Sequence, residues 1–175
     1  VGGWEVDLTS RKVRWTRITR ELHDVDHAFE PTLERAIDFY TPGNSRETIT
    51  KAINEAVAYG TSWDEELEIV TAKGNERWIR VIGEAEIRDG KCLRLYGSFQ
   101  DIHARKQAEN SLKESLLEKI DILESIGDAF FAVDKNWIVT YWNHKAELIT
   151  GILRDDIVGK SVNEIYGDAT SLGFF

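Results

Sequence analysis

The stretch from Leu93 to Ile126 constrains the fold most, because its hydrophobic period changes in the middle without a break. Up to Gln100 apolar and polar residues alternate, which is typical of a half-buried strand. After Ile102 the apolar spacing becomes about 3.6 residues, and no glycine or proline interrupts the change. The carboxylate of Asp101 can accept hydrogen bonds from the first free amides of a helix. We therefore predict a strand that runs directly into a helix, an arrangement suited to transmitting a change.

A heptad frame can be laid over residues 102–126. One seam position holds Ile102, Glu109, Leu116 and Leu123, and the other holds Arg105, Leu112, Lys119 and Ile126. Because polar residues interrupt both positions, the frame is short of a strong zipper. Two interpretations stay open: one helix that lies on a neighbouring domain, and a parallel two-helix linker in a homodimer, which we favour.

The residues before this stretch predict an α+β domain. Residues 3–8 and 13–15 alternate as a pair of strands, and residues 16–23 have helical spacing. Ser45 is expected to begin the next helix as its cap residue, and Gly60 to end it. Three strands follow over residues 63–69, 79–87 and 93–99, with a hairpin turn at Asp89-Gly90. Two strands, several helices and three strands in succession indicate an antiparallel sheet with the helices on one face.

The pattern restarts after Ile126. Val133-Asp134 precedes Trp142 by the spacing at which Val6-Asp7 precedes Trp15, and each interval holds two strand-like runs. No three-strand half follows, so residues 126–175 are expected to be an internal repeat that is cut short.

Composition excludes some functions. The net charge is −9 and no basic stripe stands out, which disfavours binding to nucleic acid. No apolar run approaches the roughly 18 residues of a membrane span, so we expect no membrane contact from this stretch. The lone Cys92 excludes an internal disulfide and fits a reducing, cytoplasmic compartment. With no methionine at all, the chain is expected to be a fragment, and a membrane anchor elsewhere in the parent protein stays open.

Residues 2–103 resemble a PAS domain, the sensory module of prokaryotic signalling proteins. The resemblance rests on Lys73-Gly74, Arg77-Trp78, Asp89-Gly90 and Gly97, and on Asp101-Ile102-His103 followed by the run from Arg105 to Glu109, which is similar to the PAS-associated (PAC) motif and its linker start. The third residue of that linker start is usually Thr, whereas it is His103 here. Residues 126–159 resemble the first half of a second PAS domain through Asn143, Ala146, Ile149-Thr150-Gly151, Asp156-Ile157 and Gly159-Lys160.

The resemblance implies a five-stranded antiparallel sheet that cups helices over its concave face. It divides the chain into a PAS sensor domain (1–103), a signalling linker helix (104–125) and an incomplete second PAS domain (126–175). The implied function is non-catalytic sensing and dimerisation upstream of an effector, most often the histidine kinase of a two-component system. A cyclic-di-GMP enzyme or a chemoreceptor is the less frequent effector.

Two sets of residues are candidates for this role. A small-molecule pocket should lie between the central helix and the inward residues of the sheet, and its candidates are Ile49, Ile53, Ala56, Val57, Ile79, Val81, Leu95 and Phe99. The same residues must form the core of any such fold, so a dimerisation module without a ligand stays open. Gly83 and Gly97 leave room on this face, which a neighbouring aromatic residue could fill.

For signal transmission the candidates are Trp78, Asp101, Ile102 and His103. Trp78 and Tyr96 have outward parity, which predicts a dimer surface or a docking surface for the linker. His103 lacks the acidic residue and proline that follow the phosphoacceptor of a histidine kinase, and no nucleophile elbow or phosphate-binding loop is found.

No cofactor is identified. Flavin–cysteine photochemistry is not supported, because Cys92 lies on the last strand with the outward parity of Arg94 and Tyr96. Haem is not supported either, since the helix over residues 45–59 carries no histidine. His23, Asp24, Asp26 and His27 form a metal-like cluster if that segment is helical, and a metal-dependent enzyme is the alternative function. A solvated loop explains these four residues equally well.

Overall fold

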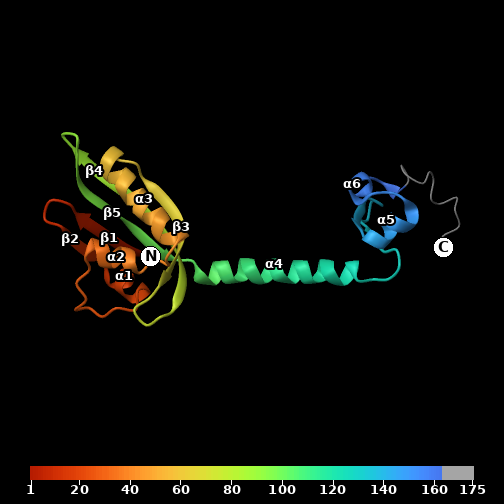
Figure 1. Cartoon of the computed structure of the whole chain (residues 1–175), viewed down its shortest axis with the longest axis horizontal. Helices are drawn as coiled ribbons and strands as arrows, with labels where there is room; N and C mark the ends of the chain where they lie inside the picture. Colours follow the sequence, from red (N-terminus) through yellow and green to blue (C-terminus); the bar gives the residue numbers. More distant parts are fainter. Residues whose placement is uncertain (163–175) are drawn as a thin grey trace. The chain divides into compact units, whose positions relative to one another are not determined.

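A computed structural model describes residues 1–162 of the chain and separates two compact units. The first unit is Val1–Glu109, and the second begins at Asn110. The helix α4 (His103–Glu124) contains the boundary between them, so it connects the two units covalently (Figure 1).

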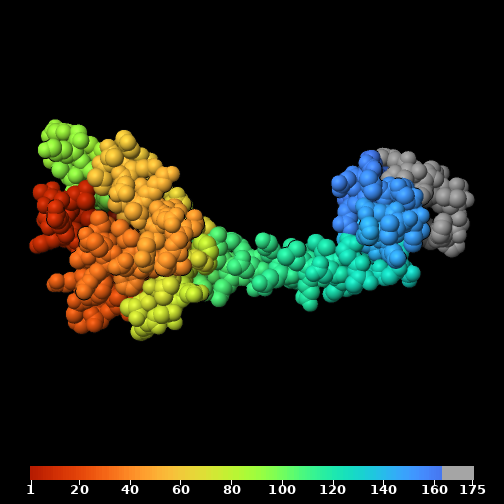
Figure 2. Space-filling model, in the orientation of Figure 1, coloured from red at the N-terminus to blue at the C-terminus, as the bar shows by residue number. Residues whose placement is uncertain are grey.

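The first unit is a five-stranded antiparallel sheet in the order β2-β1-β5-β4-β3, with its helices on one face (Figure 1). The predicted fold class is confirmed. In chain order the elements are β1 (Gly2–Asp7), β2 (Lys12–Trp15), α1 (Arg17–Leu22), α2 (Leu33–Asp38), α3 (Asn44–Tyr59), β3 (Trp63–Val70), β4 (Glu76–Arg88) and β5 (Lys91–Asp101). In the space-filling view the orange segment, which includes α2 and the start of α3, forms much of the visible face of the first unit (Figure 2).

Local chemistry accounts for several of these boundaries. Thr16 caps α1, because its hydroxyl accepts a hydrogen bond from the backbone of Thr19. Gly60 ends α3 in the left-handed region at a φ of 75°. The prediction that Ser45 caps α3 is wrong. The helix begins at Asn44 after Gly43, and the hydroxyl of Ser45 instead accepts a hydrogen bond from the Glu68 backbone at 3.1 Å.

One row of residues crosses all five strands on the concave face. Trp15 is paired with Trp4, Trp4 with Gly97, Gly97 with Gly83, and Gly83 with Trp63. The glycines occupy the middle of the row. A Cβ atom at Gly83 would lie 2.1 Å from the Trp63 ring, and one at Gly97 would lie 1.9 Å from the carbonyl oxygen of Ile82 and 2.9 Å from the Trp4 ring. The room that the two glycines leave is therefore filled by two indoles from the flanking strands.

A β-bulge on β5 changes the facing of Cys92. The register of β4 and β5 shifts between Glu86 and Ile87, so that Ile87 pairs with Cys92 and Leu93 is the extra residue. Cys92 consequently packs against the core beneath the helices. Its predicted outward facing is wrong, because strict alternation ignores the inserted residue.

The second unit contains the rest of α4, then β6 (Phe131–Val133), β7 (Val139–Trp142), α5 (His144–Thr150) and α6 (Arg154–Ile157). Its two strands are antiparallel, and Asn143 connects them to α5. The buried side chain of Asn143 accepts hydrogen bonds from the amides of Ala146 and Phe130 and donates one to the carbonyl of Asp128. The predicted second domain extends to residue 175, and its last part, 163–175, lies outside the described residues.

Within residues 1–162, no helix is both long enough and apolar enough to cross a bilayer.

The glycine row has a measurable consequence. Gly83→Ala should lower the free energy of unfolding of the first unit by about 1–3 kcal/mol, because the added methyl group overlaps the Trp63 ring. Urea denaturation followed by circular dichroism measures the change. Gly3→Ala is the control, since its Cβ would meet a methyl group of Thr16 at 3.2 Å, a contact that a small shift relieves. Equal costs for the two variants would contradict the packing role of Gly83.

Candidate functional site

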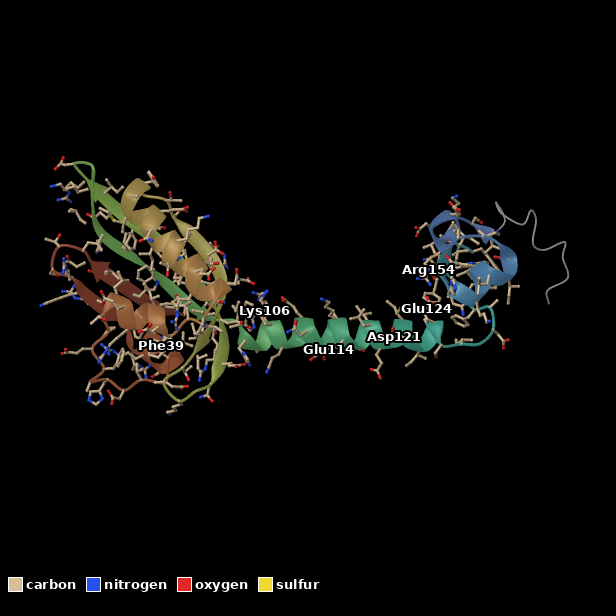
Figure 3. All side chains as sticks on the ribbon, in the orientation of Figure 1. Phe39, Lys106, Glu114, Asp121, Glu124 and Arg154 are labelled. Atoms are coloured by element: carbon tan, nitrogen blue, oxygen red, sulfur yellow. The ribbon has the colours of Figure 1, made fainter. Side chains whose placement is uncertain are left out.

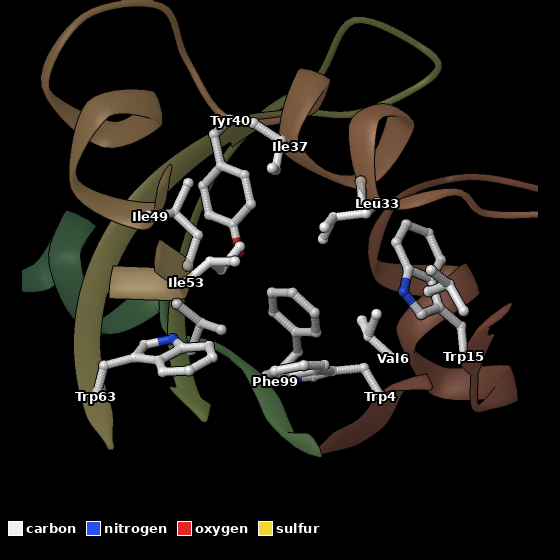
Figure 4. A pocket seen from close by; sticks show the side chains of 13 residues that line it. Trp4, Val6, Trp15, Leu33, Ile37, Tyr40, Ile49, Ile53, Trp63 and Phe99 are labelled. Carbon is white, nitrogen blue, oxygen red and sulfur yellow. The ribbon is translucent and has the colours of Figure 1, made fainter. Parts of the chain in front are cut away.

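A cavity of about 40 Å³ lies between the helices and the concave face of the first unit. All five strands and the helices α2 and α3 supply its walls (Figure 4). The residues that line it are Trp4, Val6, Val13, Trp15, Leu33, Ala36, Ile37, Tyr40, Ile49, Ile53, Trp63, Val81 and Phe99. Most of its lining is apolar.

The structure brings most of the predicted pocket residues together. Ile49, Ile53, Val81 and Phe99 line the cavity itself. Ala56, Ile79 and Leu95 are fully buried in the same core and do not border the cavity.

Val57 does not belong to this set. Its side chain is 41% exposed, whereas its neighbour Ala56 is fully buried. Successive helical residues are turned by about 100°, and Val57, unlike Ala56, is not part of the hydrophobic core. The assignment of Val57 to the pocket is therefore wrong.

Polar atoms of the cavity wall lack partners. The indole nitrogens of Trp4 and Trp63 are buried, and neither has a hydrogen-bond partner among the described residues. The Tyr40 ring is buried opposite these indoles and directs its hydroxyl group into the cavity (Figure 4). Burial raises the pKa of the Tyr40 phenol far above its ordinary value, so the hydroxyl keeps its proton. Sequence reasoning missed these three residues, although Trp and Gly facing each other across paired strands is a signal that could have found two of them.

The four residues of the metal-like cluster are not brought together. Helix α1 ends at Leu22, and Asp24 has a φ of 55°, so the helical spacing that would place His23 beside His27 is broken. His23 is fully buried and His27 is exposed. Asp26 accepts a hydrogen bond from the Ala28 amide. Among residues 1–162 no three His, Cys, Asp or Glu side chains are placed to hold a metal ion.

Asp24 has a structural partner instead. Its carboxylate accepts hydrogen bonds from Asn75 at 2.8 Å and from Arg77 at 3.2 Å. The hydrogen bond from Asn75, with the charge of Arg77 nearby, holds the pKa of Asp24 below its usual value. Arg77 also lies 4.0 Å from Asp101, which connects the end of α1 to the end of β5.

His23 lies in an aromatic enclosure. Its ring stacks on Trp15 at 4.3 Å between centroids and meets the edges of Phe39 and Phe99. Nδ1 lies 2.8 Å from the carbonyl oxygen of Thr19, so it carries the proton and donates. Burial lowers the pKa of His23 from 6.5 to about 4, because the enclosure cannot solvate an imidazolium.

The second candidate feature is the junction of β5 and α4. Ile102 is buried, and its amide donates a hydrogen bond to the carbonyl of Trp78 at 3.0 Å. Asp101 accepts a hydrogen bond from the His103 amide at 2.8 Å, which is the predicted cap. His103 follows with its Nδ1 buried and without a partner among the described residues.

Charged side chains attach the first turn of α4 to the outer face of the sheet. Lys106 Nζ lies 2.8 Å from a carboxylate oxygen of Glu66 and 4.9 Å above the Trp78 ring (Figure 3 labels Lys106). Arg105 reaches Glu66 and Glu109, each at 2.6 Å. The interactions with Lys106 and Arg105 hold the pKa of the Glu66 carboxyl below its usual value. The outward Trp78 is thus covered by the linker helix, and Glu66 is a junction residue that sequence reasoning missed.

A comparable arrangement occurs at the other end of α4, within the second unit. The carboxylate of Glu124 accepts hydrogen bonds from the amide of His144 at 2.9 Å, from the hydroxyl of Tyr141 at 2.8 Å and from the guanidinium of Arg154 (Figure 3). The hydrogen bond from the His144 amide and the other two hold the pKa of Glu124 below its ordinary value.

Two family models match the sequence, and both are described as the PAS fold. One covers residues 12–99, about half of the chain, and the other covers residues 120–169.

Among curated proteins, the chain is 26% identical over 161 residues to the Escherichia coli (strain K12) protein named "Probable diguanylate cyclase DgcE". The match covers 91% of this chain and 14% of that protein, so the chain spans only a small part of its relative.

Two solved structures share the fold. A sensory box histidine kinase/response regulator from Burkholderia thailandensis E264 gives a TM-score of 0.54 at 21% identity, over 67% of this chain and 88% of that one. The N-terminal domain of a diguanylate cyclase with PAS/PAC sensor from Marinobacter aquaeolei also gives 0.54, at 15% identity, over 60% of this chain and 97% of that one.

The depressed pKa of His23 predicts an acid-sensitive first unit. The unfolded chain takes up a proton near pH 6.5 and the folded chain only near pH 4, so protonation favours the unfolded state between these values. Stability should be intact above about pH 6.5 and fall by roughly 3 kcal/mol on acidification to about pH 4. Urea denaturation at a series of pH values measures the slope.

Two variants identify the histidine that causes the slope of stability with pH. His23→Gln should remove most of it, whereas His27→Gln should leave it intact, because His27 is exposed. A slope that survives His23→Gln would assign the acid sensitivity to other groups.

Proposed function

The chain belongs to the PAS-fold family, and we propose from that premise that its first unit is a sensory module that passes a change in its core to α4. The observation that carries the proposal is the continuity of β5 and α4. Phe99 borders the cavity, and Ile102, three residues later, is buried and begins the connection to the helix. No residue of the module is assigned a catalytic role.

The proposed mechanism starts with a ligand or partner that repacks the concave face and displaces β5. Because Asp101 caps α4 and Ile102 is anchored to the Trp78 carbonyl, a shift of β5 pulls on the first turn of the helix. The contacts of Glu66 with Arg105 and Lys106 resist that movement. The opposing contacts set the difference in free energy between two positions of α4. A ligand shifts the equilibrium between these positions only if it binds more tightly to one of them.

We propose that α4 delivers this movement to residues 126–162, interpreted as the first half of a second PAS domain. The family match to residues 120–169 supports this assignment. Glu124 is the proposed receiving residue, because its carboxylate connects α4 to Tyr141, His144 and Arg154.

The effector of the intact protein is proposed to be a signalling enzyme. A histidine kinase of a two-component system is the effector that the family resemblance favours. The 26% identity to the protein named DgcE supports a diguanylate cyclase instead. Incubation of the full-length protein with ATP or with GTP separates them, because a kinase forms an acid-labile phosphohistidine and a cyclase forms cyclic di-GMP.

We also propose that the module forms a homodimer through α4, with the outer sheet face beside it. Leu112 and Leu116 are 63% and 51% exposed, and they occupy successive seam positions of the heptad frame. Pairing of the two helices would begin after Glu109, because Ile102 is buried in the first unit and Arg105 forms ion pairs with Glu66 and Glu109. The outer sheet face carries ion pairs such as Arg94 with Glu86, so α4 supplies most of the apolar surface.

Hydrogen exchange tests the transmission. Ile53→Ala enlarges the cavity from α3, and we expect faster amide exchange over residues 103–109 at conditions where global unfolding is negligible. Asn54→Ala, the exposed neighbour on the same helix, is the control and should leave that exchange unchanged. Faster exchange in the sheet without any change in residues 103–109 would contradict the proposed path.

The dimer has its own test. Leu116→Glu places a charge in the proposed seam and should convert the dimer to a monomer, as measured by light scattering coupled to size exclusion. Leu117→Glu is the matched control, because Leu117 is similarly exposed at 51% and lies outside the seam. A wild-type monomer at micromolar concentration, or equal effects of the two variants, would refute pairing through this frame.

A further inference from the structure

Two hydrogen-bond donors of the cavity wall are fixed in place. The Trp63 ring lies against Gly83 and the Trp4 ring against Gly97, with the two rings 5.6 Å apart between centroids. Each indole is held between the sheet and the helices above it, and each nitrogen is buried without a partner among the described residues. Buried polar groups are rarely left unpaired in native proteins, so two such donors on one cavity indicate something that they bind.

A third donor approaches from the opposite wall. Tyr40 is 3% exposed, and Figure 4 shows its hydroxyl group directed into the space above the Trp63 and Phe99 rings. Unlike the indoles, the hydroxyl can also accept, but its neutral phenol form supplies a proton whenever an acceptor is present.

The rest of the wall is uncharged. None of the thirteen lining residues is Asp, Glu, Lys, Arg or His. An ionised ligand would lose its hydration without gaining a counter-charge, and a cation would face the positive ends of three donors. A pure hydrocarbon would fill the space and leave the donors unpaired. The remaining class is an uncharged molecule with an apolar body and an oxygen acceptor.

The size of the cavity limits that molecule. A water occupies roughly 10–15 Å³ of such volume, and an engineered cavity that holds benzene has about 150 Å³. The cavity has about 40 Å³, so a five-membered ring enters only if the helices move away from the sheet. Binding and movement are thereby coupled, which is what a sensor requires.

We propose that the cavity binds a small, uncharged carbonyl compound whose oxygen accepts hydrogen bonds from the indole N–H groups of Trp4 and Trp63 and from the hydroxyl of Tyr40. The proposal rests on the proposed sensory function, and it names the chemical class of the signal.

The test is an NMR titration of the chain with cyclopentanone and with methylenecyclopentane, in which a CH₂ group replaces the oxygen. The chain has six tryptophans, and the variants Trp4→Phe and Trp63→Phe assign the two relevant indole signals. Cyclopentanone should move both indole N–H signals downfield and bind at least about tenfold more tightly than the hydrocarbon. The Trp78 signal should not move, because Trp78 lies on the opposite face under Lys106.

Conservative variants complete the test. Trp63→Phe keeps a ring on Gly83 and removes the donor, so it should reduce the affinity for the ketone to that for the hydrocarbon. Tyr40→Phe removes the hydroxyl donor and keeps the aromatic ring. This variant replaces Trp63→Phe in the test if Trp63→Phe does not fold. The preference for the ketone should fall in this variant as well.

Three outcomes would overturn the proposal. The first is equal affinity for the two compounds, and the second is no shift of the two indole signals with the ketone. The third is that both indole N–H groups already donate to internal water and that their signals stay unchanged when the ketone is added. These outcomes are separable from a failure of the sensory function. That function fails when Ile53→Ala leaves residues 103–109 unaffected, whatever the cavity binds.

Discussion

The structure of the first unit depends on two indole rings that lie on two glycines. Trp4 and Trp63 come from strands that are not neighbours, and they meet over Gly97 and Gly83, which occupy the two strands between them. A side chain at Gly83 would take the space that the Trp63 ring occupies, and one at Gly97 would meet the backbone carbonyl of Ile82 as well as the Trp4 ring. The row therefore favours one register of β1, β5, β4 and β3. Its two indole rings form part of the sheet side of the cavity, and α2 and α3 form the opposite side.

The cavity wall and the linker helix share one strand. Phe99 of β5 lines the cavity, and Asp101, two residues beyond it, caps α4. Ion pairs exposed on a surface contribute little to stability individually, so the contacts of Glu66 are better suited to fixing the direction of α4 than to holding the fold. Rigid packing on the concave side and weak, adjustable contacts on the outer side are compatible with a junction that moves.

Much of the fold was predictable because its signals are local. The change of period after Ile102, the turn at Asp89-Gly90 and the alternation of the strands predicted the α+β architecture and the strand that continues into a helix. The errors arose where one residue changes a facing or a partner. The bulge at Leu93 makes Cys92 face the core. Val57 is exposed although it directly follows the buried Ala56, and the hydroxyl of Ser45 binds the backbone of β3 instead of capping α3. Hydrophobic periodicity cannot predict any of these three differences.

The sequence alone determined the order of the elements, the glycines at the centre of the sheet and the apolar residues that face the helices, since hydrophobic period and turn residues act over a few neighbours. Only the tertiary structure decided which tryptophans fill the space above the glycines, that His23 is enclosed by aromatic rings while His27 is exposed, and that Glu66 binds the first turn of α4. Each of these depends on strand register and on contacts between residues far apart in the chain. Such contacts form only when the whole sheet is assembled.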